Sequence, residues 1–86
     1  MPSDHVQNPV SLGQLPEGSS GVVLEFTCHN AILHRLRELG MTRGTQVAVK
    51  RLAPFGDPME ITVRGFNVSI RRADASCIVL EKIETR

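Results

Sequence analysis

The clearest alternation of hydrophobic and polar positions lies between residues 59 and 64, where every second residue is apolar. Side chains of a β-strand point alternately to its two faces, so this pattern predicts a strand with one buried and one solvated face. The segment 45–52 is rich in β-branched residues and predicts another strand. The residues expected to face the core are Met59, Ile61 and Val63 in the later strand and Val47 and Val49 in the earlier one.

A helix is predicted over residues 31–39, because apolar side chains recur there at three- and four-residue spacing. These side chains are Ile32, Leu33, Leu36 and Leu39. Asn30 is the expected N-cap, since its side chain can accept a hydrogen bond from a free first-turn N–H. Gly40 is the expected C-terminal stop, because glycine tolerates the left-handed conformation that ends many helices.

Three further strands are predicted before and after these two strands and the helix. The first covers residues 22–27, with Val22, Leu24 and Phe26 inward. A type II′ turn formed by Gly65 and Phe66 leads into the second, over 67–71, with Val68 and Ile70 inward. The third covers 77–83, and single helical turns are expected at 11–15 and 72–76.

The expected fold is mainly β: a small SH3-like barrel of about five antiparallel strands, with a short helix after the first strand. A small sheet of short strands hides its edges best by curling into a barrel. An OB-fold is the alternative, but its helix usually lies between the third and fourth strands. Residues 1–10 are expected to form a flexible tail, and residues 11–86 the domain.

Length and composition indicate one soluble domain. The chain has 86 residues, 41% of them hydrophobic, and no apolar run approaches the roughly 20 residues that cross a bilayer. Residues 1–10 are polar and lack the apolar core of a signal peptide. The only two cysteines, Cys28 and Cys77, are too few for a disulfide framework. We therefore expect a cytoplasmic protein with buried free thiols.

Positive charge is concentrated in the middle of the chain, where residues 30–72 hold eight basic and three acidic side chains. Solvated surface charges are the favoured interpretation, because both signs are normal on a soluble domain. Nucleic-acid binding is not expected, since the chain has three Phe and neither Trp nor Tyr to stack on bases. Polyproline recognition is disfavoured for the same reason.

Metal binding and catalysis are also not expected. Cys28 and His29 are adjacent and are expected to point to opposite faces of an extended segment. His34 follows His29 by five residues, Cys77 and His5 are distant, and the chain has no CxxC or HxxxH pair. Weak metal binding at Cys28, His29 or His34 stays an open alternative. The sequence contains no nucleophile–base motif and no phosphate-binding loop, so we predict no enzyme activity and no cofactor.

The order of glycines, prolines and apolar residues resembles the FeoA family over about residues 9–83. The matching motifs are Leu15-Pro-x-Gly18, Arg35-Leu36-x-x-Leu39-Gly40-Met41-x-x-Gly44, Ala53-Pro54-x-Gly56-Asp57-Pro58, Val63-x-Gly65 and Ile70-Arg71-x-x-x-Ala75. The resemblance implies a small SH3-like cytosolic protein that accompanies FeoB, the GTPase-coupled ferrous-iron transporter of the bacterial inner membrane. The same domain type forms the C-terminal part of iron-dependent repressors.

An accessory role in ferrous-iron uptake is therefore expected, through contact with the cytoplasmic, GTPase-bearing region of FeoB and without direct membrane insertion. The alternative is a generic SH3-like interaction or regulatory domain, of the transcription-factor or nucleic-acid-binding kind. Connections between elements often carry binding residues on a rigid scaffold. The expected partner-binding residues are Met41, Arg43, Gly44, Phe55 and Pro58, and Arg43 is also the candidate for an arginine that reaches into a partner GTPase.

Overall fold

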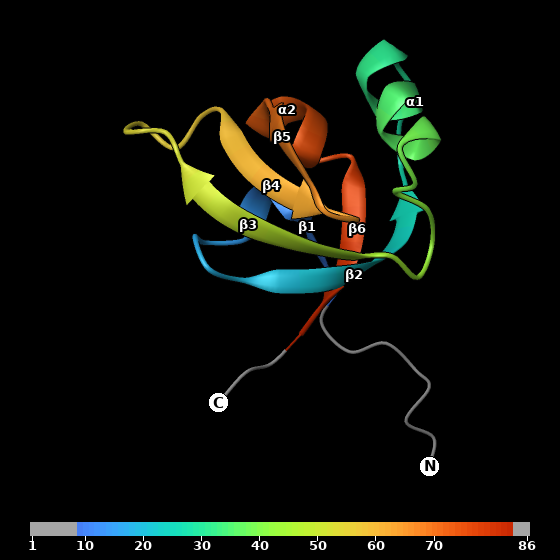
Figure 1. Cartoon of the computed structure of the whole chain (residues 1–86), viewed down its shortest axis with the longest axis horizontal. Helices are drawn as coiled ribbons and strands as arrows, with labels where there is room; N and C mark the ends of the chain where they lie inside the picture. Colours follow the sequence, from blue (N-terminus) through green and yellow to red (C-terminus); the bar gives the residue numbers. More distant parts are fainter. Residues whose placement is uncertain (1–8, 84–86) are drawn as a thin grey trace.

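The computed structural model describes residues 9–83, which form one antiparallel sheet of six strands in the spatial order β1-β6-β2-β3-β4-β5. Figure 1 shows the sheet strongly curled, with α1 at one corner and the β3–β4 loop at the opposite end. The elements are β1 (Pro9–Ser11), η1 (Leu12–Gln14, a 3₁₀ turn), β2 (Ser20–Phe26), α1 (Ala31–Glu38), β3 (Gln46–Leu52), β4 (Met59–Val63), β5 (Phe66–Ile70), α2 (Arg72–Ala75) and β6 (Ile78–Lys82).

The mainly β, SH3-like architecture agrees with the sequence-based expectation, but the sheet has one strand more. Pro9 and Val10, which were expected to lie in the tail, belong to β1 and pair with β6 opposite Glu81 and Leu80. A strand of three residues is too short to show an alternation of apolar and polar positions. The rest of the expected tail, residues 1–8, lies outside the described residues.

The core lies inside the curl of the sheet and confirms the two central strand predictions. Val47 and Val49 of β3 are at most 1% exposed. The alternate residues of β4 are likewise buried, and the other helices and strands except β1, together with two connections, supply the rest of the core. Its buried members are Leu12, Leu15, Val23, Leu33, Leu36, Met41, Val47, Val49, Met59, Ile61, Val63, Ile70, Ala75, Ile78 and Leu80.

The inward face predicted for β2 is wrong for Val22 and Leu24 and right for Phe26. Val23 is fully buried, whereas Val22 and Leu24 are only partly covered and lie outside the core. The pairing with β6 shifts between Val23 and Glu25, which is the irregularity of a β-bulge. Phe26 therefore packs against the core although it lies an odd number of residues from Val23. A bulge breaks the two-residue period on which the prediction rested.

The hairpin between β4 and β5 also turns one residue earlier than predicted. Arg64 and Gly65 are the central residues, with φ angles of 49° and 84°. Two positive φ angles in a two-residue loop are typical of a type I′ turn, not the expected type II′ turn. Phe66 consequently begins β5 and pairs with Val63. Val68 and Ile70 face inward as predicted.

Helix α1 begins at Ala31 as predicted and ends at Glu38, one residue before the predicted end, with both expected capping residues in place. The Asn30 side chain accepts a hydrogen bond of 2.9 Å from the Leu33 N–H, and Gly40 follows the helix with a φ of 109°. Leu33 and Leu36 are buried, but Ile32 and Leu39 remain 48% and 36% exposed. The apolar stripe is thus wider than the face that packs on the sheet. No helix within residues 9–83 is long and apolar enough to cross a membrane.

The expectation of two free cysteines is wrong, because Cys28 and Cys77 form a disulfide with their Cα atoms 5.5 Å apart. The two residues are 49 positions apart in sequence. They meet because β2 and β6 are antiparallel neighbours, and Phe26 pairs with Ile78 at the end of this ladder. That adjacency depends on the order of strands in the sheet, which residue spacing does not reveal.

Candidate functional site

The five residues expected to bind a partner do not form one cluster. Met41 is fully buried and packs in the core, so its side chain is not available on the surface. Arg43 and Gly44 are exposed on the link before β3. Phe55 and Pro58 are exposed on the loop after β3. The residues that can reach a partner therefore lie at two separate places.

These two places are at opposite ends of β3, as Figure 1 shows for the α1–β3 link and the β3–β4 loop. Strand β3 has seven residues. A strand rises about 3.3 Å per residue, which separates the two connections by roughly 20 Å. One small ligand cannot bridge them, but one protein surface can, because a standard interface buries about 800 Å² on each partner.

The β3–β4 loop presents Phe55 with 98% of its surface exposed. Phe55 is far more exposed than Phe66, the next most exposed phenylalanine, at 51%. A large aromatic side chain held wholly in solvent gains nothing for folding, because it buries almost no apolar area. Exposed aromatic residues on a fixed loop are instead typical anchors of protein interfaces.

Hydrogen bonds at its base hold this loop in shape. The Ala53 N–H donates to the Pro58 carbonyl at 3.1 Å, and the Gly56 N–H donates to the Ala53 carbonyl at 2.7 Å. The Asp57 carboxylate accepts from the backbone N–H of Arg72 at 2.9 Å. The loop is therefore tied both to itself and to the start of α2.

The side chain of Arg72 also holds the loop in place. Its guanidinium donates to the Gly56 carbonyl from Nε at 3.1 Å and from Nη2 at 2.9 Å, and Nη1 donates to the Gly13 carbonyl of η1. Three segments that are far apart in sequence are thus joined by one half-buried side chain. A loop ordered before binding loses less entropy when a partner engages it.

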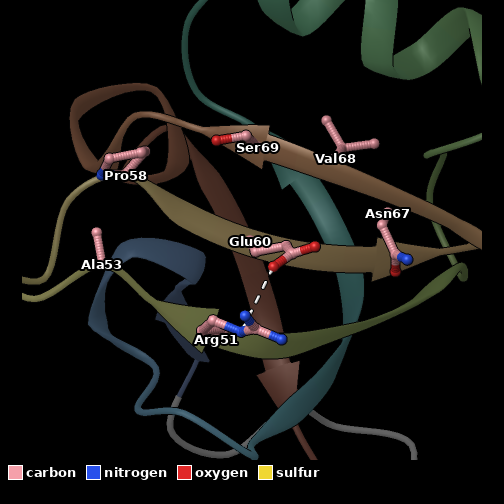
Figure 2. Close-up of a pocket in the computed structure, with 7 residues that line it drawn as sticks. All are labelled: Arg51, Ala53, Pro58, Glu60, Asn67, Val68 and Ser69. Atoms are coloured by element: carbon pink, nitrogen blue, oxygen red, sulfur yellow. Dashed lines mark ion pairs between the residues drawn. The ribbon is translucent and has the colours of Figure 1, made fainter.

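A shallow hollow of about 330 Å³ lies beside this loop, on the face of β3, β4 and β5. We call it the sheet-face hollow. Figure 2 shows its lining side chains on the three neighbouring strands and at the two ends of the loop. They are Arg51, Ala53, Pro58, Glu60, Asn67, Val68 and Ser69.

The charges of the sheet-face hollow are already partnered within it. Arg51 Nε lies 3.7 Å from Glu60 Oε1, across the β3–β4 pair (Figure 2). The side-chain amide oxygen of Asn67 accepts a hydrogen bond of 2.9 Å from the Thr62 hydroxyl. What remains is a mostly neutral surface continuous with Ala53 and Pro58 of the loop. Such a surface is better suited to form the rim of a protein–protein interface than to bind a charged small ligand.

The other end of β3 is organised by Thr45, the one buried polar side chain among the described residues, at 6% exposure. Its hydroxyl donates to the Gly40 carbonyl at 3.0 Å and accepts from the Thr42 N–H at 3.2 Å. Arg64 Nε also donates to the Gly40 carbonyl at 3.0 Å. These bonds fix the link between α1 and β3, and so fix the place from which Arg43 extends.

Arg43 borders a second hollow, of about 270 Å³, between the end of β2, α1 and the link. We call it the helix-end hollow. Arg37 lies over the Phe26 ring at its wall, with the guanidinium carbon 5.3 Å from the ring centre, a cation–π distance. The complete lining is Leu24, Glu25, Phe26, His29, Arg37, Thr42 and Arg43. Two guanidinium groups and one carboxylate leave it a positive excess.

Metal ligands do not gather in the part of the chain that the structure describes. No group of three His, Cys, Asp or Glu side chains there is close enough to hold an ion. His34 Nε2 lies 3.2 Å from Glu38 Oε2 on the exposed side of α1, and the two cysteine sulfurs bond to each other. His5 lies outside the described residues.

Reasoning from the sequence missed the two residues that fix these connections. Arg72 and Thr45 contact atoms of segments up to 59 positions away, and neither belongs to a motif with a recognised chemical role. The sequence offered one hint for each: Arg72 begins a predicted helical turn, and Thr45 begins a predicted strand beside a glycine. Neither hint identifies a carbonyl partner.

Comparison with known proteins gives consistent results. The model of the FeoA domain family matches residues 10–82. A fusion of Fe(2+) transport protein A with the Fe(2+) transporter FeoB from Porphyromonas gingivalis is 31% identical over 74 residues, which cover 86% of this chain and 9% of the fusion protein. The chain thus spans less than a tenth of that relative's length.

Solved structures of FeoA proteins have the same fold. The FeoA protein of Chlorobium tepidum is 34% identical, with a TM-score of 0.76 over 84% of this chain and 70% of the other. The FeoA protein of Stenotrophomonas maltophilia is 28% identical, with a TM-score of 0.74 over 86% and 95% of the two chains. It was solved as a zinc complex and described as an SH3 domain protein and a candidate activating factor of ferrous iron transport.

Proposed function

This chain belongs to the FeoA family, and we propose that it is an accessory protein of ferrous-iron uptake that docks on the cytoplasmic, GTPase-bearing region of a FeoB-type transporter. Support comes from the Porphyromonas gingivalis relative, in which the FeoA and FeoB parts are fused in one chain. Fusion places two partners at high effective concentration, which favours even a weak contact between them. We assign the protein no reaction of its own, and place it at the inner face of the membrane through this partner.

The observation that carries the docking proposal is the exposure of Phe55 on a loop that is already ordered. In our account Phe55 inserts into an apolar socket of the transporter, while Pro58 and the sheet-face hollow form the surrounding contact. Truncating such an anchor usually costs a complex more than changing the residues around it. The occupant of this surface is therefore a folded protein domain with an apolar pocket.

Arg43 has a second role in this proposal. It lies roughly 20 Å from the loop, the length of β3, and it is exposed beside the positive helix-end hollow. Charges at the rim of an interface chiefly speed the encounter of complementary surfaces. We propose that Arg43 attracts an acidic part of the same transporter region, and that Gly44 holds the link in the conformation from which Arg43 extends.

Titration of the isotopically labelled protein with the FeoB GTPase-bearing region, followed by NMR, tests this function. We expect saturable binding, with the largest amide shifts in residues 53–58 and smaller ones at 42–44. Parallel titrations with double-stranded DNA and with RNA at two salt concentrations test the nucleic-acid alternative. Binding to a nucleic acid that is lost at high salt, together with no binding to the transporter region, would overturn the proposal.

A further inference from the structure

The disulfide between Cys28 and Cys77 joins the end of β2 to the start of β6 at the base of α1. Figure 1 shows α1 standing at the corner of the molecule, next to the ends of these two strands. Both cysteines are half-buried and pack against the edge of the core. A small thiol or disulfide reagent can therefore approach the pair from solvent.

Other contacts keep the two cysteine segments together. The Thr27 N–H and hydroxyl both donate to the Cys77 carbonyl, at 2.7 and 3.2 Å. The Asn30 side-chain amide donates to the Asp74 carboxylate at 3.0 Å. These bonds do not depend on the sulfur atoms, so the thiols remain neighbours when the disulfide is reduced. The pair can then close again within one molecule.

We propose that Cys28 and Cys77 form a reversible redox site that sets how firmly α1 is fastened to the barrel. The reversibility rests on the proposed function, because a protein at the cytoplasmic face of FeoB meets a glutathione pool that keeps most thiols reduced. A disulfide that forms there is typically transient and responds to oxidants.

The reaction is a thiol–disulfide exchange with glutathione disulfide. One cysteine thiolate attacks glutathione disulfide and releases one glutathione, and the other thiolate then displaces the second glutathione from the mixed disulfide. The protein loses two protons and two electrons, and the two glutathione molecules that form gain them. Excess glutathione drives the same exchange backwards.

Helix α1 is the element that this bond affects most. It has only eight residues, too few to persist without packing, and Leu33 and Leu36 are its two buried side chains. Its N-cap residue, Asn30, follows Cys28 by two positions. The disulfide therefore adds a covalent tie beside the Asn30–Asp74 hydrogen bond at the point from which the helix starts, and so steadies Arg37 over Phe26 in the helix-end hollow.

The test uses the whole chain alone, equilibrated with mixtures of glutathione and glutathione disulfide. Mass spectrometry after thiol labelling measures the disulfide fraction, and amide hydrogen exchange measures the opening of residues 31–38. We expect interconversion in both directions across these mixtures. We also expect exchange in α1 to be at least about tenfold slower in the disulfide form, a smaller effect than disulfides commonly have on whole-protein stability.

The Cys28→Ser variant is the matched control, because it retains a small polar side chain and cannot form the bond. Its α1 exchange should equal that of the reduced wild type in every mixture. Chemically reduced wild type gives the same comparison if the variant does not fold. The proposal is overturned by a disulfide that survives the most reducing mixture, by thiols that stay unpaired in the most oxidising one, or by equal α1 exchange in both forms. None of these outcomes involves the transporter, so they leave the docking proposal separately testable.

Discussion

The guanidinium group of Arg72 donates two hydrogen bonds to the Gly56 carbonyl oxygen, from Nε at 3.1 Å and Nη2 at 2.9 Å. This contact joins α2 to the loop that presents Phe55. The same side chain also donates a hydrogen bond to the Gly13 carbonyl. Arg72 therefore links three elements: η1, the loop and α2. The shape of the proposed docking surface thus depends on a residue that does not itself belong to it.

Replacing Arg72 with Ala should lower the free energy of unfolding by about 2 kcal/mol or more, since hydrogen bonds to a charged group are lost and two carbonyls are left without this donor. Denaturant unfolding measures this loss. Arg71→Ala is the matched control, because Arg71 is exposed and should change stability by no more than about 0.5 kcal/mol. Equal effects of the two variants would contradict the role given to Arg72.

Thr45→Val should destabilise the protein by about 1–3 kcal/mol, because it removes a buried hydroxyl that both donates and accepts hydrogen bonds. Thr45→Ser retains the hydroxyl and should recover most of that loss. Thermal unfolding of the two variants measures the difference. A Val variant as stable as the Ser variant would show that the link is held by packing alone.

Leu36→Ala should cost about 2–5 kcal/mol, the usual range for a buried leucine, since Leu36 is 2% exposed. Leu39→Ala should cost much less, because Leu39 is 36% exposed on the same helix. The pair of unfolding curves therefore tests which side of the apolar stripe packs on the sheet. Similar midpoints for the two variants would contradict the observed orientation of α1.

Arg43→Glu should slow association with the transporter region and weaken its dependence on salt, while thermal stability changes by no more than about 0.5 kcal/mol. Arg43→Lys preserves the positive charge and should associate almost as the wild type does. Gly44→Val is expected to lower stability instead, because Gly44 has a φ of 91° and a side chain there is strained. Stopped-flow kinetics separates the three variants. A wild-type association rate for Arg43→Glu would remove Arg43 from the proposed contact.

Most of the fold could be predicted from local pattern. The strands around Val47 and Ile61 alternate or carry β-branched residues, and Asn30 and Gly40 bound α1 by well-understood capping chemistry. These features depend only on near neighbours along the chain. The predictions failed where a distant segment decides the outcome, as in the bulge after Val23.

The candidate site was harder to predict for the same reason. The loop residues Phe55 and Pro58 and the link residue Arg43 were found as exposed positions beside turn-forming glycines and prolines. Met41 was misjudged, because a methionine after a helix-ending glycine can face either the core or the solvent. The bonds of Arg72 and the pairing of Cys28 with Cys77 require strands and loops that the tertiary fold alone brings together.

The central claim is that Phe55 anchors this protein to the cytoplasmic, GTPase-bearing region of FeoB, and the affinity of Phe55→Ala for that region tests it most directly. Isothermal calorimetry should show a loss of affinity of about 30-fold or more, as expected for an interface hot spot, with unfolding unchanged. Phe66→Ala, at the other exposed phenylalanine, should bind as the wild type does. Wild-type affinity for Phe55→Ala, or an equal loss for Phe66→Ala, would contradict the account.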